Sequence, residues 1–159
     1  HRYIRRQRQM CIRDSCPFCD AEKLLGAEDF RDTPNGLGVI EHRMDLLYQG
    51  VLTGEITLQR WVELCSTTPA RLFGLQGRKG IIAPGADADI VIFNPKTEHV
   101  LGASTHHMSI DYSVWEGIKV QGQSESVISR GSFVIRDRNF VGKPGHGEFL
   151  KRSLPEPLR

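Results

Sequence analysis

The first group of residues whose spacing could support chemistry is a Cys-x-x-Cys motif. Cys16 and Cys19 have the separation found in zinc and redox motifs. Such a site needs a second cysteine pair or a βαβ setting, and Cys11 and Cys65 do not form a matching pair. We therefore favour ordinary loop cysteines over a metal or redox role.

A pair of carboxylates is the second candidate. Asp87 and Asp89 lie on one face at strand spacing, and paired carboxylates can divide the roles of general acid and base. The segment Gly85-Ala86-Asp87, however, is a turn that enters a strand, and aspartate is favoured in such turns because its side chain bonds nearby backbone groups. We interpret the pair as structural.

The histidines lack a metal-binding pattern. His106 and His107 are adjacent, so their side chains point to different sides of an extended chain, and one site rarely uses both. We expect them to be surface or hydrogen-bonded structural residues. His42 lies on a predicted helix and is expected to be solvated, and His146 lies between two glycines and is expected to make contacts only.

Composition excludes several classes of protein. The 159 residues are 39% hydrophobic and 25% charged, enough for a buried core, as one domain or part of a larger one. The net charge of +2 is too small for a nucleic-acid footprint, although basic residues cluster in residues 1–13. No apolar run could span a bilayer, no secretory signal is visible, and four cysteines fit reduced thiols. We therefore expect a cytoplasmic protein without nucleic-acid or membrane partners.

Helical signals fill the first half of the chain. Apolar residues at steps of four, three and four predict a helix over roughly 38–50, with Ile40, Met44, Leu47 and Val51 on one face. Thr57 is a suitable N-cap for a helix over 58–65, and Thr68-Pro69 is expected to start another. Trp61 and Trp115 are expected in the core or an interface.

Strand signals fill the second half. Short strands are predicted at 80–82, 117–122, 126–130 and 132–137, and a buried strand at 88–93 that Asn94-Pro95 ends. Arg130-Gly131 predicts a tight hairpin, and the glycines and prolines after Gly142 predict an extended tail. The helical layer thus passes into a β-layer within residues 66–95, as expected where the last helices of a barrel lead into strands.

Residues 1–15 show no clear helical or strand period. We interpret them as a non-homologous N-terminus, either artefactual or disordered. The chain begins with His1 and not with methionine, from which we expect an incomplete reading frame.

Five stretches carry a family resemblance: CPFC, TPNGLGVIEHRMDLLYQGV, ITLQRWVELCSTTPARLFGLQGRKGIIAPGADADIVIF, THHMSIDYSVWEG and GHGEFLKR. In these the chain closely resembles dihydropyrimidinases and D-hydantoinases of the amidohydrolase superfamily. The resemblance covers residues 16–159 and corresponds to the C-terminal third of those proteins.

The resemblance implies an α/β fold, the C-terminal part of a (β/α)₈ metal-dependent hydrolase barrel plus the C-terminal strands of a β-sandwich. Residues 16–79 would be the last loop and helices of the barrel, 80–140 the sandwich strands, and 141–159 a C-terminal tail. Active sites of such barrels lie at the C-terminal ends of the strands, so the turn at residues 32–36 would lie over the pocket.

The resemblance also implies a chemistry. The family hydrolyses cyclic diamides, dihydropyrimidines or 5-substituted hydantoins, with two zinc ions bridged by a carbamylated lysine and held further by four histidines and an aspartate. The backbone of Asn35 would bind the ring amide. Asp14, two residues before Cys-Pro-Phe, would bind one zinc ion and carry the proton to the leaving nitrogen, although Ser15 replaces the usual histidine. The other ligands are expected upstream.

A non-catalytic alternative stays open. The dihydropyrimidinase-related proteins keep the fold but lack the metal chemistry and act as assembling scaffolds. Those relatives usually carry glutamate where Asn35 stands, so the turn favours the enzyme. For the full-length protein the resemblance implies a homotetramer.

Overall fold

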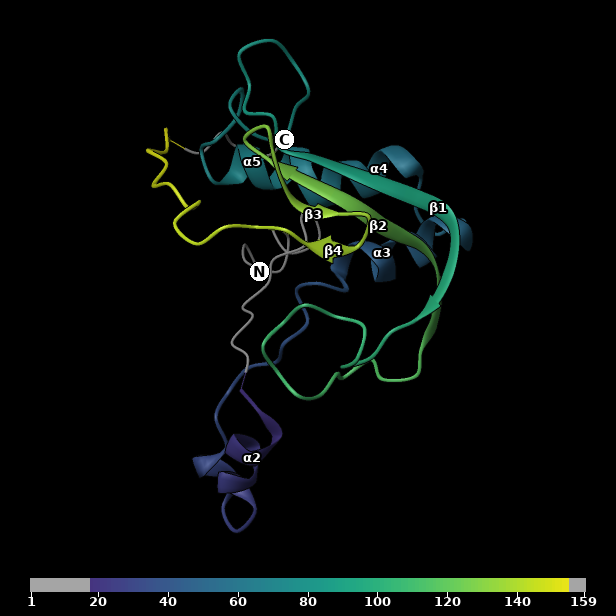
Figure 1. The fold of residues 1–159 in the computed structure, drawn as a ribbon, viewed down its shortest axis with the longest axis vertical. Coiled ribbons are helices and arrows are strands. Elements are labelled where there is room, and N and C mark those ends of the chain that lie inside the picture. The colour runs from purple at the N-terminus through teal and green to yellow at the C-terminus, as the bar shows by residue number, and fades with distance from the viewer. Residues whose placement is uncertain (1–17, 155–159) are drawn as a thin grey trace.

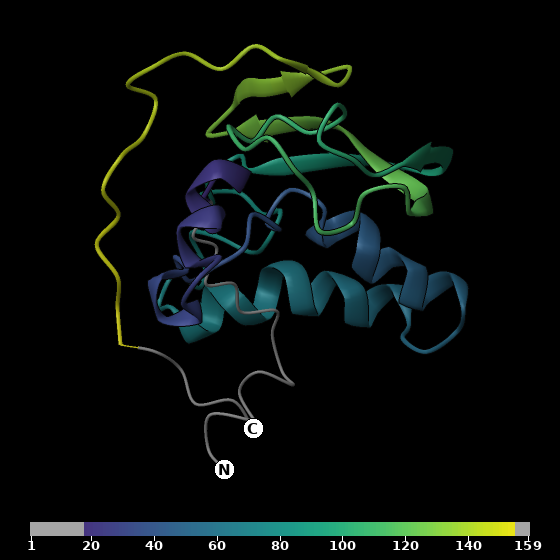
Figure 2. The same cartoon turned by 90° about the horizontal axis from the view of Figure 1, so that it is seen from below.

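Two layers, one of helices and one a sheet, form the body of the molecule (Figures 1 and 2). The structure is a computed structural model that describes residues 18–154, so Asp14, Cys16 and the segment 1–15 lie outside the described residues. The helices are α2 (Asp20–Lys23), α3 (Arg43–Leu52), α4 (Leu58–Val62) and α5 (Thr68–Leu72), with 3₁₀ turns η1 (Leu24–Gly26) and η2 (Phe30–Asp32) and a π-helical turn η3 (Glu63–Thr67). The strands are β1 (Ile90–Val100), β2 (Lys119–Ser129), β3 (Ser132–Arg136) and β4 (Asn139–Phe140).

Helices α4 and α5 form one rod through the π-helical turn. Thr57 caps its start as predicted, because its Oγ1 accepts a hydrogen bond from the Arg60 N–H at 3.1 Å. The predicted break before Thr68 is absent. Pro69 lacks the N–H that would bond back into the helix, and η3 lies directly before it, so a wider turn accommodates the proline without ending the helix.

Helix α3 starts later than the periodicity predicts, at Arg43 and not near residue 38. Ile40, expected on its apolar face, is 53% exposed. The buried residues of α3 are Asp45 and Tyr48. The apolar pattern missed this face because one of its two buried residues is an acid, which only a partner elsewhere in the fold can satisfy.

Three aromatic rings join the helical layer to the sheet. Tyr48 of α3, Trp61 of α4 and Phe93 of β1 have ring centroids 4.8 to 5.4 Å apart, within the range of favourable edge contacts. The Trp61 Nε1–H donates to the Met44 carbonyl at 3.2 Å, which satisfies its one polar group. Trp61 is therefore a core residue, as predicted.

The sheet is antiparallel, with its four strands in the order β1-β2-β3-β4. Three predictions about it are wrong. Residues 80–82 form no strand, and Ile82 is 84% exposed, because the short apolar segment has no strand to pair with. The segments 117–122 and 126–130, predicted as two strands, both overlap the single strand β2. The strand predicted to be buried, β1, lies at the open edge of the sheet, where Val91 is 44% exposed.

Strand β1 also continues past Pro95, which the sequence predicted would end it. The register changes between Asn94 and Glu98, so residues 95–97 face Gly122 of β2 in a bulge. Gly122 has a φ of 93°, a conformation that glycine adopts without strain. Because β1 is an edge strand and Pro95 lies in the bulge, its missing N–H breaks no required ladder bond.

The end of the described chain behaves as predicted. Arg130 and Gly131, with φ of 45° and 80°, form the tight turn between β2 and β3. From Gly142 to 154 the chain has no helix or strand and runs back along the body (Figure 2). It is held near its end, where Ser153 donates from both its N–H and its Oγ to the Gly74 carbonyl, each at 2.9 Å, and in its middle, where the Arg130 side chain donates to the His146 carbonyl.

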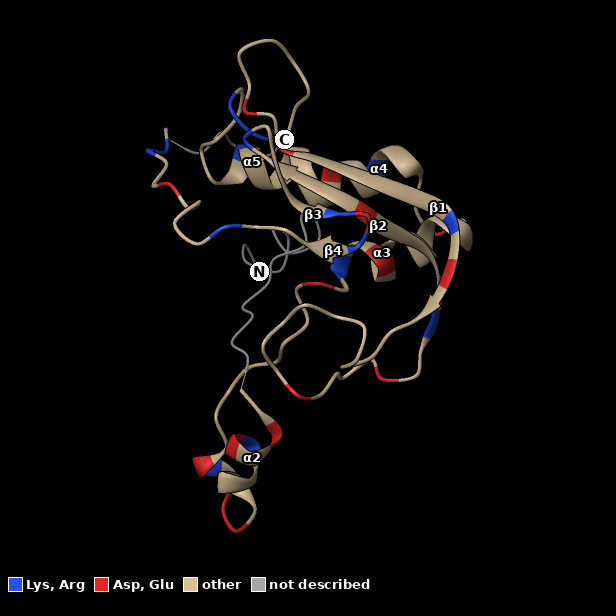
Figure 3. Cartoon of the chain, viewed as in Figure 1, with Lys and Arg blue, Asp and Glu red and all other residues tan. Residues whose placement is uncertain are grey.

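Charge is spread over the described part of the chain. Figure 3 shows acidic and basic residues interspersed over helices, strands and loops. None of the helices formed by residues 18–154 has the length and apolar character needed to cross a bilayer.

The contact at Gly122 gives a test of the fold. A Cβ at this position would lie 2.5 Å from Tyr48 Cδ1 and 2.7 Å from Phe93 Cζ, so Gly122→Ala must displace the rings that join the two layers. Gly117→Ala is the matched control, since Gly117 has a similar φ of 81° but open space around it. We expect Gly122→Ala to lower the free energy of unfolding by about 2 kcal/mol more than Gly117→Ala in urea titrations followed by tryptophan fluorescence. Equal losses would show that the rings can move aside.

Candidate functional site

The Thr33–Gly36 turn is the segment predicted to meet substrate. It follows directly after η2. Asp29 caps the start of η2, because its carboxylate accepts a hydrogen bond from the Arg31 N–H at 2.9 Å. Gly36 has a φ of 115° and so requires glycine. Asn35 is exposed, and within residues 18–154 neither its backbone N–H nor its C=O has a hydrogen-bond partner.

A lysine from α2 holds this turn from behind. The Lys23 Nζ donates to the Pro34 carbonyl and, at 2.7 Å, to the Gly36 carbonyl. The Nζ also lies 5.2 Å from the centroid of the Phe18 ring, a favourable distance for a cation–π contact. The carbonyls on both sides of Asn35 are therefore fixed by one ammonium group, while the peptide groups of Asn35 stay open.

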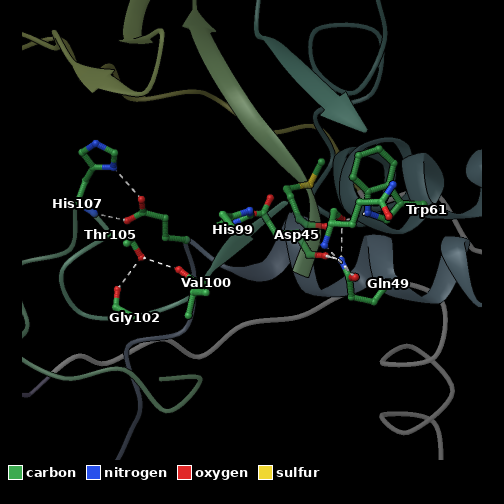
Figure 4. Close-up of polar contacts among 11 residues, drawn as sticks. Asp45, Gln49, Trp61, His99, Val100, Gly102, Thr105 and His107 are labelled. Atoms are coloured by element: carbon green, nitrogen blue, oxygen red, sulfur yellow. Dashed lines mark hydrogen bonds and ion pairs between the residues drawn. The ribbon is translucent and has the colours of Figure 1, made fainter. Parts of the chain in front are cut away.

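A mainly apolar cavity with several ionisable side chains in its lining lies between α3 and the sheet. Its volume is about 380 Å³, and its lining includes Glu41, His42, Asp45, His99 and Arg138. His42, which the sequence predicted to be solvated, is 3% exposed, because it precedes α3 at the point where the helix meets the rest of the fold. Figure 4 shows His99 directed at Asp45, with Gln49 and Trp61 on the far side of the aspartate.

Asp45 and His99 form the central pair of this cavity, with the His99 Nε2 and the Asp45 Oδ2 3.2 Å apart. The distance would suit an ion pair, but burial raises the pKa of Asp45 to about 7 and lowers the pKa of His99. Both directions favour the uncharged forms, and burial lowers the pKa of His42 as well. Below pH 7 the pair is therefore a contact between uncharged groups and not an ion pair.

The loop that carries His106 and His107 closes one side of the cavity. The His107 N–H and Nδ1 each lie 2.7 Å from a carboxylate oxygen of Glu41, as the dashed lines at His107 in Figure 4 show. The His107 Nε2 lies 3.0 Å from the Arg138 carbonyl. The His106 Nδ1 instead accepts from the Met108 N–H at 3.1 Å. The two histidines thus have different partners and structural roles, as predicted.

The aspartate pair is also structural. The Lys79 Nζ contacts the carboxylates of both Asp87 and Asp89, and the Arg78 Nε lies 2.9 Å from Asp87 Oδ2. The hydrogen bond from Lys79 lowers the pKa of Asp87, which keeps it ionised and unsuited to donate a proton. These ion pairs fasten the loop after α5 to the start of β1.

No group of three or more histidine, cysteine, aspartate or glutamate side chains within residues 18–154 is placed to hold a metal ion. Cys19 forms no disulfide within the described residues. The described residues therefore do not fit a metal centre, and no reaction step through a metal can be derived from them. Asp14, the one metal ligand predicted from the resemblance, lies outside them.

Comparison with known proteins shows the family to which the chain belongs. The model of the amidohydrolase family matches residues 36–134, which is more than half of the sequence. The chain belongs to the amidohydrolase family. It is 49% identical over 151 residues to a D-hydantoinase of Streptomyces coelicolor, covering 94% of this chain and 32% of that protein. It is 51% identical over 142 residues to a D-hydantoinase of Geobacillus stearothermophilus, covering 88% of this chain and 30% of that protein.

Solved structures agree with this family membership. The chain superposes on the crystal structure of dihydropyrimidinase from Brevibacillus agri with a TM-score of 0.88 and 46% identity, over 91% of this chain and 32% of that one. The predicted fold class, the C-terminal part of an α/β amidohydrolase, is confirmed. The amidohydrolase chain described here spans about a third of the length of these relatives.

Sequence reasoning missed two residues that the structure singles out. Lys23 lies on an exposed helix of four residues, and only the fold shows that it reaches Pro34 and Gly36. Asp45 is an acid within an apolar helical pattern, and the structure shows that it is buried. The interruption of the pattern was the signal that the sequence contained.

The Asp45–His99 pair predicts a pH-dependent stability. Because the pKa of Asp45 is raised on folding to about 7, the folded state holds the proton more tightly, and this contribution is lost as pH rises through 7. Asp45→Asn removes the titration. We expect the free energy of unfolding of the variant, relative to the parent chain, to rise by about 2 to 3 kcal/mol from about pH 5 to pH 8.

Urea titrations at several pH values would measure this difference. The histidines with lowered pKa values oppose the trend, but they are present in both proteins and cancel in the comparison. Asp20→Asn on exposed α2 is the control and should show no such rise. A variant that is destabilised equally at both pH values would mean instead that Asp45 is ionised and paired with charged His99.

Proposed function

We propose that the complete protein is a hydrolase that opens cyclic amides, either hydantoins or dihydropyrimidines. Identities of 49% and 51% to two D-hydantoinases, over nearly the whole of this chain, support the proposal. The superposition on a dihydropyrimidinase supports the same reaction class, because both substrates contain a ring amide beside a second carbonyl.

The observation that carries the proposal is the free backbone of Asn35. A cyclic diamide presents an N–H donor next to carbonyl acceptors on one ring edge. The open N–H and C=O of Asn35 are the complementary donor and acceptor, in that order, and the residue is exposed. We infer that Asn35 binds the ring amide through its main chain, which orients the ring carbonyl for attack by water.

The amidohydrolase family is generally metal-dependent. We propose two zinc ions bridged by a carbamylated lysine in the complete protein, with Asp14 as one ligand and as the carrier of the proton to the leaving nitrogen. Residues 18–154 contain no cluster of three or more potential ligands, so we expect the remaining ligands upstream of this chain. Bound metal of this kind would supply an activated hydroxide and polarise the ring carbonyl.

The arrangement of the complete protein is also a proposal. We assign residues 16–79 to the last loop and helices of the barrel, 80–140 to the sandwich strands and 141–159 to the tail, with 1–15 as a non-homologous segment. The family resemblance supports a cytoplasmic homotetramer. The non-catalytic scaffold stays as the alternative, but the asparagine at position 35 argues against it.

Hydrolysis assays on two proteins test the proposed function. The complete reading frame that contains this chain should open hydantoin or dihydrouracil in a reaction that a chelator abolishes and zinc restores. The 159-residue polypeptide alone should show no turnover and bind zinc weakly, since it offers at most one of the six expected ligands. An inert, metal-loaded complete protein would favour the scaffold, and zinc-dependent turnover by the 159-residue chain would overturn the expected ligand set.

A further inference from the structure

Both hydrogen bonds of the Lys23 ammonium group are made to the turn that surrounds Asn35. The group donates to the Pro34 and Gly36 carbonyls and lies 5.2 Å from the centroid of the Phe18 ring. We propose that Lys23 is a positioning residue for substrate: it fixes the turn so that the peptide groups of Asn35 face the ring. This proposal rests on the proposed function.

Peptide geometry explains how the contact with Pro34 acts. The Pro34 carbonyl and the Asn35 N–H belong to one planar, trans peptide, in which C=O and N–H point in opposite directions. When Lys23 holds the carbonyl from behind, the Asn35 N–H must point away from Lys23. The positive charge of the Lys23 ammonium group beside the carbonyl oxygen also polarises the peptide, which makes the Asn35 N–H a better donor.

The second contact fixes the other end of the turn. Lys23 holds the Gly36 carbonyl at 2.7 Å, and Gly36 has a φ of 115°. The peptide between Asn35 and Gly36 therefore lies between two anchored peptides. Its carbonyl, that of Asn35, cannot rotate freely, so both groups that would meet the ring amide are oriented before substrate arrives.

Helix α2, which carries Lys23, is itself held in place by hydrogen bonds. The Cys19 N–H donates to Glu22 Oε2 at 2.7 Å at the start of α2, and the Asp20 N–H donates to Asp111 Oδ1 at 2.9 Å in a distant loop. At the other end, a Cβ on Gly26 would lie 1.7 Å from Thr33 Oγ1, so η1 and the first residue of the turn are in direct contact.

This support is needed because of where the segment lies. Figure 1 shows α2 and its 3₁₀ turns extending away from the two-layered body. The rigid core therefore does not hold the turn directly. The Lys23 contacts do so locally, and charge-assisted hydrogen bonds are strong enough for that role.

Kinetics of the complete hydrolase test this role. Lys23→Met keeps the length of the side chain but removes its donors, so we expect KM for hydantoin or dihydrouracil to rise about 10- to 100-fold, with a much smaller change in kcat and unchanged bound zinc. Lys23→Arg should recover part of the affinity, because guanidinium can still donate to both carbonyls. Lys143→Met, on the exposed tail, is the control and should match the parent.

Backbone NMR relaxation in the 159-residue chain tests the clamp without any activity. Lys23→Met should lower the order parameters of the Asn35 and Gly36 amides to values typical of flexible backbone, below about 0.6, whereas α3 amides keep their parent values. If the turn loosens but the complete protein opens no ring, the clamp stands and the proposed function fails. If the parent hydrolase is active and Lys23→Met changes neither KM nor these order parameters, the positioning role is wrong.

Discussion

The contact of Tyr48, Trp61 and Phe93 over Gly122 holds the two layers together. Each ring comes from a different element, and they meet where β2 has a residue without a side chain. The bulge that places Gly122 there also lets β1 pass through Pro95. The absence of a side chain at Gly122 therefore determines how closely the helices approach the sheet, and the bulge at the same residue determines how far the edge strand β1 extends.

The polar groups around this contact follow from the same close approach. The Gln49 side chain donates to the Gln121 carbonyl at 2.9 Å and accepts from the Gln121 N–H at 3.2 Å, which is strand-like pairing by a helix residue. One turn before it, Asp45 is carried below the surface, where it meets the His99 side chain and the backbone of Ser124. Because both are buried, neutral forms cost less than separated charges, which explains the opposite directions of their pKa shifts.

Local chemistry was predictable from the sequence, and long-range partners were not. The Thr57 cap and the Arg130-Gly131 turn depend on residues within a few positions, and both were predicted correctly. The strand at 80–82, the end of β1 at Pro95 and the solvation of His42 depended on partners far along the chain, and all three were wrong. Periodicity describes one element at a time, whereas these features depend on what an element meets.

The same distinction applies to the candidate site. Asn35 was found through a resemblance in local sequence, and its open peptide groups fit that role. Lys23 was not found, because its side chain acts on a turn more than ten residues away and its helix has no buried residue. The comparison with Asp45 shows why the two charged residues differ. Lys23 is partly exposed and its ammonium group donates to two backbone carbonyls, whereas Asp45 lies below the surface, where burial makes its charge costly.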